Sequence, residues 1–285
     1  MAQLTSHEVI EAQRQDWNRV ASGWEKWDRL FDQQMAYLNH RLVADAHLCQ
    51  GQRVLDLGSG TGYPALLAAQ TVGPTGSVVG IDLAEQMLVA AERKAKRLGL
   101  TNIVFRTGDV STLPFDQHTF DAATSRFCLM FLPEIPMALA EIARVIKPGG
   151  YFAAAVWSTP DKNPYLNIPI NVIKQFIELP PPDPTAPGIF RLARPGDLAG
   201  MLRQAGFADI CEQEILADVR FPAAQDYVES LMEIAAPVQN LFAKLTAGQQ
   251  EAARDGILQN AHRFQRNTAI VLPIAVRFVS AQTPV

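Results

Sequence analysis

A short apolar strand that runs directly into a glycine turn constrains this chain more than any other feature. Residues 54–62 read Val-Leu-Asp-Leu-Gly-Ser-Gly-Thr-Gly, and a helix is expected from Pro64 to Val72. Glycine lets a backbone approach a ligand without a side chain in the way, and the free N–H groups at a helix start attract a carboxylate or a phosphate. The segment therefore predicts a ligand-binding turn at the end of a buried strand.

Strands and helices alternate on both sides of this turn. The pattern predicts strands at 53–57, 77–81, 103–105, 120–124 and 151–156, and helices at 64–72, 84–98 and 135–146. Such alternation is typical of an α/β fold in which helices cover both faces of a parallel sheet, here doubly wound. Further on, a helix is expected at 194–206, strands at 210–221 and 268–281, and helical structure at 224–264. The two late strands predict an antiparallel pair at the end of the mostly parallel sheet.

The same pattern divides the chain into four segments. Residues 1–50 look helical and carry Trp17, Trp24 and Trp27, which suit a lid over a pocket as well as a helix packed on the core. Residues 51–157 form the ligand-binding core. Residues 158–193 are rich in proline, and a connection of this length is often a functional loop, here one that contacts substrate; its prolines include Pro180, Pro181, Pro182, Pro184 and Pro187. Residues 194–285 supply the last part of the sheet, with the helical insertion at 224–264.

Composition narrows the function classes. A net charge of −4, without a run of lysine and arginine, argues against a nucleic-acid partner. The long uncharged stretch from Leu57 to Ile81 holds six glycines and two prolines, so we expect loops and short elements there and no integral membrane segment. The first twenty residues show no signal peptide. Three scattered cysteines and five scattered histidines predict neither a disulfide framework nor a metal site, so a cytoplasmic location is the default expectation.

Two acidic residues distinguish between possible cofactors. Asp82 lies twenty residues after Gly62 at the end of the second strand, where a carboxylate can accept both hydroxyls of a ribose. A dinucleotide-binding turn would place its third glycine at position 63, which is Tyr63. Asp56 stands before the glycines, where it would repel a pyrophosphate and would suit a cationic ammonium group. A nucleotide-dependent oxidoreductase is therefore the less favoured alternative.

With these motifs, residues 51–157 resemble the class I S-adenosylmethionine-dependent methyltransferases. Asp56, Gly58, Gly60 and Gly62 match the first motif of that family, which holds the methionine end of the cofactor, and Asp82 matches the second. The matching segments further on are Gly108-Asp109-Val110, Ser125-Arg126-Phe127 and Arg144 to Gly150. Leu113-Pro114-Phe115 after Asp109 is similar to the branch that contains the ubiquinone and menaquinone C-methyltransferases.

The resemblance implies a seven-stranded, Rossmann-like methyltransferase fold and S-adenosyl-L-methionine as cofactor, released as S-adenosyl-L-homocysteine. It implies transfer of the methyl group by in-line displacement to an O, N or C atom of a small aromatic or lipophilic metabolite, by a monomer or a homodimer. The cofactor-binding residues would be Asp56, Gly58, Ser59, Gly60, Gly62, Asp82, Leu83, Met87, Gly108, Asp109, Val110, Ser125 and Arg126. A methyltransferase-like module that binds without catalysis is a second alternative.

The expected pocket for the acceptor lies past the carboxyl ends of the strands. We expect it to be lined by Trp24, Trp27, Phe127, Trp157, Tyr165 and Phe190. Arg126 and His40 are the candidate catalytic residues, with Glu25 and Asp28 as further candidates in the lid; none is assigned.

Overall fold

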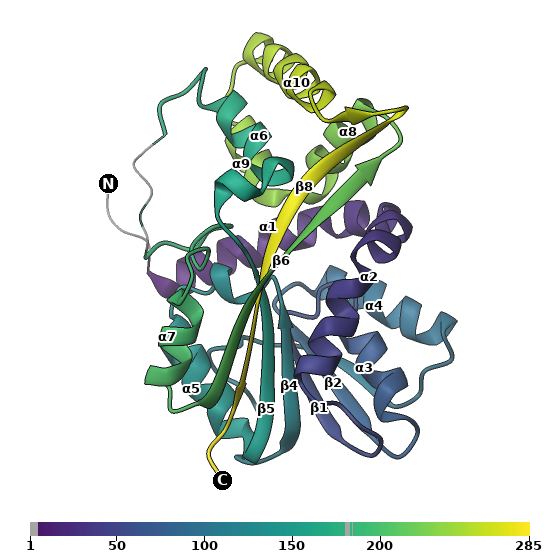
Figure 1. Cartoon of the computed structure of the whole chain (residues 1–285), viewed down its shortest axis with the longest axis vertical. Helices are drawn as coiled ribbons and strands as arrows, with labels where there is room; N and C mark the ends of the chain where they lie inside the picture. Colours follow the sequence, from purple (N-terminus) through teal and green to yellow (C-terminus); the bar gives the residue numbers. More distant parts are fainter. Residues whose placement is uncertain (1–4, 180–182, 184) are drawn as a thin grey trace.

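The fold is a twisted sheet with helices on both faces (Figure 1). The computed structural model describes residues 5–179, 183 and 185–285. The strand order is β3-β2-β1-β4-β5-β8-β6, with the short β7 paired to β8. The strands are β1 (Arg53–Leu57), β2 (Ser77–Asp82), β3 (Ile103–Thr107), β4 (Phe120–Arg126), β5 (Ile146–Trp157), β6 (Ala208–Phe221), β7 (Gln265–Arg266) and β8 (Ala269–Gln282).

Strands β3, β2, β1, β4 and β5 are parallel, whereas β8 is antiparallel to both β5 and β6. This confirms the predicted α/β class, the mostly parallel sheet and the antiparallel pair near the C-terminus. The chain reverses direction across the sheet between β1 and β4, its central neighbours. In sheets of this kind, ligands bind beyond the carboxyl ends of the strands at that reversal.

Both faces of the central strand β1 are buried. Val54 of β1 packs into a cluster with Ala65 and Ala69, whereas its neighbour Leu55 belongs to the main core. Successive side chains of a strand point to opposite faces, so helices are needed on each side. The helices are α1 (Ser6–Lys26), α2 (Asp28–Asp45), α3 (Ala65–Val72), α4 (Glu85–Arg97), α5 (Ile135–Val145), α6 (Pro164–Ile173), α7 (Asp197–Gln204), α8 (Ala224–Ile234), α9 (Ala236–Phe242) and α10 (Ala247–His262).

The N-terminal segment forms α1 and α2, which meet at Trp27. Helix α1 packs on α4 and also on α8 and α9, while α2 packs on β4 and β5. An ion pair joins the ammonium group of Lys94 on α4 to Asp28 at the start of α2. The segment therefore connects the parallel core to the C-terminal helices.

Strands β6 and β8 continue beyond the parallel strands and carry the helical insertion, which consists of α8, α9 and α10 (Figure 1). The segment 158–193 contributes α6, so part of the predicted proline-rich loop is helical. Pro180, Pro181, Pro182 and Pro184 lie outside the described residues. Tyr227 of α8 donates a hydrogen bond from its hydroxyl to the carbonyl oxygen of Tyr165 at 2.7 Å. The result is a helical layer across the carboxyl ends of the parallel strands.

Candidate active site

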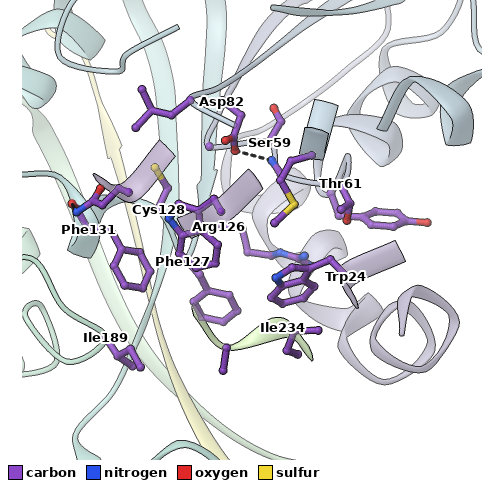
Figure 2. Close-up of a pocket in the computed structure, with 18 of the residues that line it drawn as sticks. Trp24, Ser59, Thr61, Asp82, Arg126, Phe127, Cys128, Phe131, Ile189 and Ile234 are labelled. Atoms are coloured by element: carbon purple, nitrogen blue, oxygen red, sulfur yellow. Dashed lines mark hydrogen bonds between the residues drawn. The ribbon is translucent and has the colours of Figure 1, made fainter. Parts of the chain in front are cut away.

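A large cavity lies between the carboxyl ends of the parallel strands and the helical layer (Figure 2). It encloses about 1390 Å³, the open space at its mouth included. The centre of a water-sized sphere can occupy about 200 Å³ of this space. Residues of the glycine turn and of the helical layer line the same cavity.

The glycine turn after β1 forms one wall. Gly58, Gly60 and Gly62 have φ angles of +69°, +50° and +109°, a region that residues with a Cβ atom rarely adopt. A Cβ atom on Gly58 would also stand 2.5 Å from the Sγ atom of Cys128. The turn thus needs glycine at position 58 for its backbone conformation and for its close contact with the loop after β4.

Asp82 connects this turn to the end of β2 through hydrogen bonds. Its Oδ2 atom accepts the N–H of Gly60 at 2.8 Å, drawn as a dashed line in Figure 2, and its Oδ1 atom accepts the N–H of Ala84 at 2.8 Å. Burial raises the pKa of this carboxyl group above its usual value, and the hydrogen bonds from the backbone oppose that rise. Each carboxylate oxygen keeps a further acceptor position, so Asp82 can hold the turn and still receive ligand hydroxyls.

Asp56 lies beneath the turn and outside the cavity lining. Its Oδ1 atom accepts a hydrogen bond from the hydroxyl of Thr124 at 2.7 Å, and its Oδ2 atom has no partner among the described residues. Burial raises the pKa of Asp56 to about 6, although the bonds from Thr124 and Ser59 lower it. An unpartnered buried carboxylate oxygen at this position is consistent with a cationic group bound nearby.

Aromatic rings form a second wall of the cavity. Phe127 and Trp157 stack with ring centres 4.0 Å apart and planes 5° from parallel, and Tyr165 lies beyond them. Phe127 has a φ of +56°, an outlier for a bulky residue. Strained backbone of this kind clusters at functional sites. The stack offers a flat apolar surface next to the glycine turn.

The structure places most of the predicted site residues in the lining. From the predicted cofactor set, the lining includes Gly58, Ser59, Gly60, Asp82, Leu83, Met87, Gly108, Val110 and Arg126, and from the predicted acceptor set it includes Trp24, Phe127, Trp157 and Tyr165. Asp56, Gly62, Asp109, Ser125, Trp27, Phe190 and His40 do not line it. His40 is exposed on α2, and the indole N–H of Trp27 donates to Glu233. Asp109 accepts the N–H of Ser111 at 2.8 Å.

Several lining residues were not among the predicted site residues, although Trp17 was named as suiting a lid. They are Gln13, Trp17, Phe31, Met35, Thr61, Tyr63, Cys128, Phe131, Leu132, Leu166, Ile189, Ile234, Ala235 and Pro237. Most come from the N-terminal helices, from α6 or from the junction of α8 and α9, and only their spacing on helices could have hinted at a shared face. Burial raises the pKa of the Cys128 thiol, so the thiol stays neutral at physiological pH and is a poor nucleophile.

Residues 54–150 match the family model described as a methyltransferase domain. A demethylmenaquinone methyltransferase of Symbiobacterium thermophilum is 36% identical over 146 residues, which are 50% of this chain and 54% of that protein. The corresponding protein of Staphylococcus aureus is 36% identical over 141 residues, 48% of this chain and 57% of its own. Residues 54–150 are a class I methyltransferase domain. This confirms the recognition made from the sequence, and S-adenosyl-L-methionine is the cofactor of such a domain.

The chain spans about half the length of these curated relatives. Among solved structures, a putative methyltransferase of Bacillus halodurans has a TM-score of 0.58 at 21% identity, with 87% of this chain and 99% of that chain covered. The [4+2]-cyclase SpnF has a TM-score of 0.55 at 24% identity, with 87% and 81% covered. These likenesses establish the fold. No helix among the described residues is long and apolar enough to cross a membrane.

Three features of the methyltransferase domain fit the binding of its cofactor. The glycine turn brings backbone to the cavity without a Cβ atom at Gly58 and Gly60, Asp82 has free acceptor positions, and the Oδ2 atom of Asp56 has no hydrogen-bond partner among the described residues. Leu83, Met87 and Val110 add apolar surface next to Asp82 that suits a purine base.

We predict that Gly58→Ala weakens the binding of S-adenosylhomocysteine at least about tenfold, because the added methyl group collides with Cys128 and distorts the turn. Gly99→Ala is the matched control, since Gly99 has the same φ of +69° with nothing within 4 Å of its added Cβ atom. It should lower stability by about 1–2 kcal/mol without changing affinity. Calorimetric titration and thermal unfolding measure the two effects; equal affinity losses in both variants would contradict this explanation.

We also predict a stability difference that depends on pH between the wild type and Asp56→Asn. The folded chain holds the Asp56 proton up to a pKa of about 6, against a usual value of 3.8. Between these values the folded state binds more protons than the unfolded state, so its stability falls as the pH rises. Relative to Asp56→Asn, the wild type should lose on the order of 2 kcal/mol between pH 4 and 6.5. Denaturant unfolding at several pH values tests this, and a constant difference would argue against it.

Proposed function

We propose that this chain is an S-adenosylmethionine-dependent methyltransferase that acts on a small, flat, lipophilic molecule. The observation that carries the proposal is the continuity of one cavity, in which the glycine turn and Asp82 face the stacked rings of Phe127 and Trp157. The first wall suits a nucleoside and the second an apolar ring. A cofactor and an acceptor bound in this cavity would lie in contact.

The residues around Asp82 would hold the cofactor. Asp82 would accept the ribose hydroxyls, and Asp109 would receive the exocyclic amino group of the adenine, which would pack between Leu83 and Val110. The backbone of Gly58 and Gly60 would lie along the methionine end. Asp56 and Ser125 would face the methionine ammonium group from below the turn, and Gly62 and Met87 would support this arrangement.

When bound, the cofactor supplies an electrophilic methyl group on a sulfonium. The chain would supply placement and a dry environment. Trp24, Trp157 and Tyr165 would hold the acceptor with its reactive atom in line with the methyl group, and alignment of this kind contributes on the order of 7–11 kcal/mol to lowering a barrier. Among the described lining residues Asp82 is the one carboxylate, and it lies on the cofactor side. Acid–base catalysis by the protein is therefore a small part of this mechanism.

The kind of acceptor is suggested by the aromatic wall and by the relatives. The named relatives are demethylmenaquinone methyltransferases, and a quinol or a similar ring would match the stacked rings of Phe127 and Trp157 in shape and polarity. The acceptor atom, O, N or C, stays a prediction, and so do the roles of Trp27, Phe190 and His40, which do not line the cavity. The lid role of residues 1–50, a monomeric or homodimeric state, a cytoplasmic location and the lack of nucleic-acid partners also remain predictions.

The two alternatives have less support. A nucleotide-dependent oxidoreductase would require a turn that accepts a pyrophosphate, and here Tyr63 replaces the third glycine while Asp56 lies beneath the turn. A module that binds without catalysis would be expected to have lost part of the cofactor wall, and Gly58, Gly60 and Asp82 are in place.

The proposal predicts that S-adenosylmethionine and S-adenosylhomocysteine bind the wild type with micromolar affinity, and that Asp82→Asn weakens both at least about tenfold through lost charge-assisted hydrogen bonds. Asp121→Asn is the matched control, because Asp121 also accepts a backbone N–H, that of Arg53. Asp121 lies at the start of β4, whereas the cavity lies at the carboxyl ends of the strands. Calorimetric titration measures the affinities, and transfer of a labelled methyl group to a panel of quinols and phenols measures activity. A folded wild type that binds neither compound would refute the methyltransferase proposal.

A further inference from the structure

Arg126 is a cation in the cavity without an anionic partner of its own. Its Nη1 atom donates to the Oδ1 atom of Asn39 at 2.8 Å. Within the part of the chain that the structure describes, it makes no other hydrogen bond through its side chain and no ion pair. A guanidinium group has five N–H donors and stays charged in proteins. Most of the donors of Arg126 are therefore available to a ligand.

Two of the acidic residues near Arg126 each use a carboxylate oxygen for another partner. Burial lowers the pKa of the Arg126 guanidinium, and Asp56 and Asp32 only partly offset this through their charges. Asp56 is bonded to Thr124, and Asp28 is paired with Lys94. An enclosed charge without a close counter-charge is costly unless a ligand supplies one.

A second free donor lines the same cavity. The Nε1 atom of Trp24 is buried and has no hydrogen-bond partner among the described residues. Trp24 reaches the cavity from α1 and Arg126 from the end of β4, and both are drawn in Figure 2. The large majority of buried side-chain polar atoms have a hydrogen-bond partner, so an unpartnered indole N–H on a cavity-lining residue points to a ligand acceptor.

The surroundings of these donors are apolar. Phe31, Met35 and Phe127 line the cavity with them. Water held there would meet few other polar partners, and a charge-assisted hydrogen bond is stronger in such surroundings than in solvent. The donors therefore favour an anionic oxygen carried by a ligand.

We propose that Arg126 and Trp24 form a binding subsite for an anionic oxygen, either a carboxylate or an ionised phenol or enol. The inference rests on the proposed function, because that function supplies two molecules that could carry such an oxygen. One is the carboxylate at the methionine end of the cofactor, and the other is the acceptor itself. An acceptor held there would bind in its ionised form and release its proton to water.

The test uses pairs of probes that differ in the anionic oxygen. S-adenosylhomocysteine carries the carboxylate, and 5′-methylthioadenosine lacks the whole amino-acid end. Naphthalene-2-carboxylate is a flat anion, and naphthalene-2-carboxamide is its neutral counterpart. Calorimetry at pH 7.5 gives the affinity of each probe for the wild type, for Arg126→Met and Arg126→Lys, and for Trp24→Phe, which removes only the N–H and part of the ring.

Each control variant makes a similar change in a side chain that does not belong to the proposed subsite. Tyr37→Phe removes a buried hydroxyl of α2 that also has no hydrogen-bond partner among the described residues but does not line the cavity. Arg41→Met removes an arginine of α2 that pairs with Asp45 outside the cavity. Thermal unfolding identifies any variant that fails to fold, in which case Arg126→Lys and Trp24→Phe decide the outcome.

We expect Arg126→Met to weaken at least one anionic probe roughly tenfold to a hundredfold, and Trp24→Phe to weaken the same probe less, with neutral probes and both controls within twofold. Loss of S-adenosylhomocysteine affinity assigns the subsite to the cofactor, and loss of naphthalene-2-carboxylate affinity assigns it to the acceptor. Unchanged affinity for both anions, or an equal loss for the neutral probes, overturns the inference. A wild type that binds neither nucleoside instead refutes the proposed function.

Discussion

The hydrogen bond between the carboxylate of Asp82 and the N–H of Gly60 is the contact on which the site depends. It joins the loop after β1 to the end of β2, and the N–H groups of Gly58 and Ser59 add bonds to the carbonyl oxygen of Ile81 at 2.8 and 2.9 Å. These bonds fix a turn whose positive φ angles favour glycine. A binding surface that is ordered before the ligand arrives loses less entropy on binding.

The two halves of the cavity come from different parts of the chain. The cofactor wall lies within residues 54–150, which match the family model, whereas Trp24, Tyr165 and Ile234 lie outside it. The long antiparallel pair β6 and β8 makes the second half possible, because it carries α8 and α9 over the ends of the parallel strands. Under the proposed function, the region that matches the family model would hold the cofactor, and residues outside it would add to the acceptor wall that Phe127 begins.

The local sequence was sufficient to predict those parts of the fold and site that depend on neighbouring residues alone. The glycine turn, the acid at the end of β2 and the alternation of strands and helices follow from backbone conformation and hydrophobic periodicity. Trp27 and Phe190 were expected in the cavity and are not in its lining, because Trp27 ends α1 and bonds Glu233 while Phe190 packs on the core.

Long-range packing decided the rest. Ile234 reaches the cavity from a helix that follows β6, and Arg126 is positioned by Asn39, 87 residues before it. The spacing of apolar residues shows that a helix has a buried face, but it does not show what that face meets. The partner of Arg126 and the free N–H of Trp24 could therefore be found only in the folded chain.

A crystal structure of the chain with S-adenosylhomocysteine would show directly whether one cavity holds the cofactor beside the aromatic rings. We predict the ribose hydroxyls on the carboxylate of Asp82 and the sulfur atom facing the stacked rings of Phe127 and Trp157, with space left between them for an acceptor. A nucleoside bound elsewhere, or a sulfur atom turned away from those rings, would contradict it.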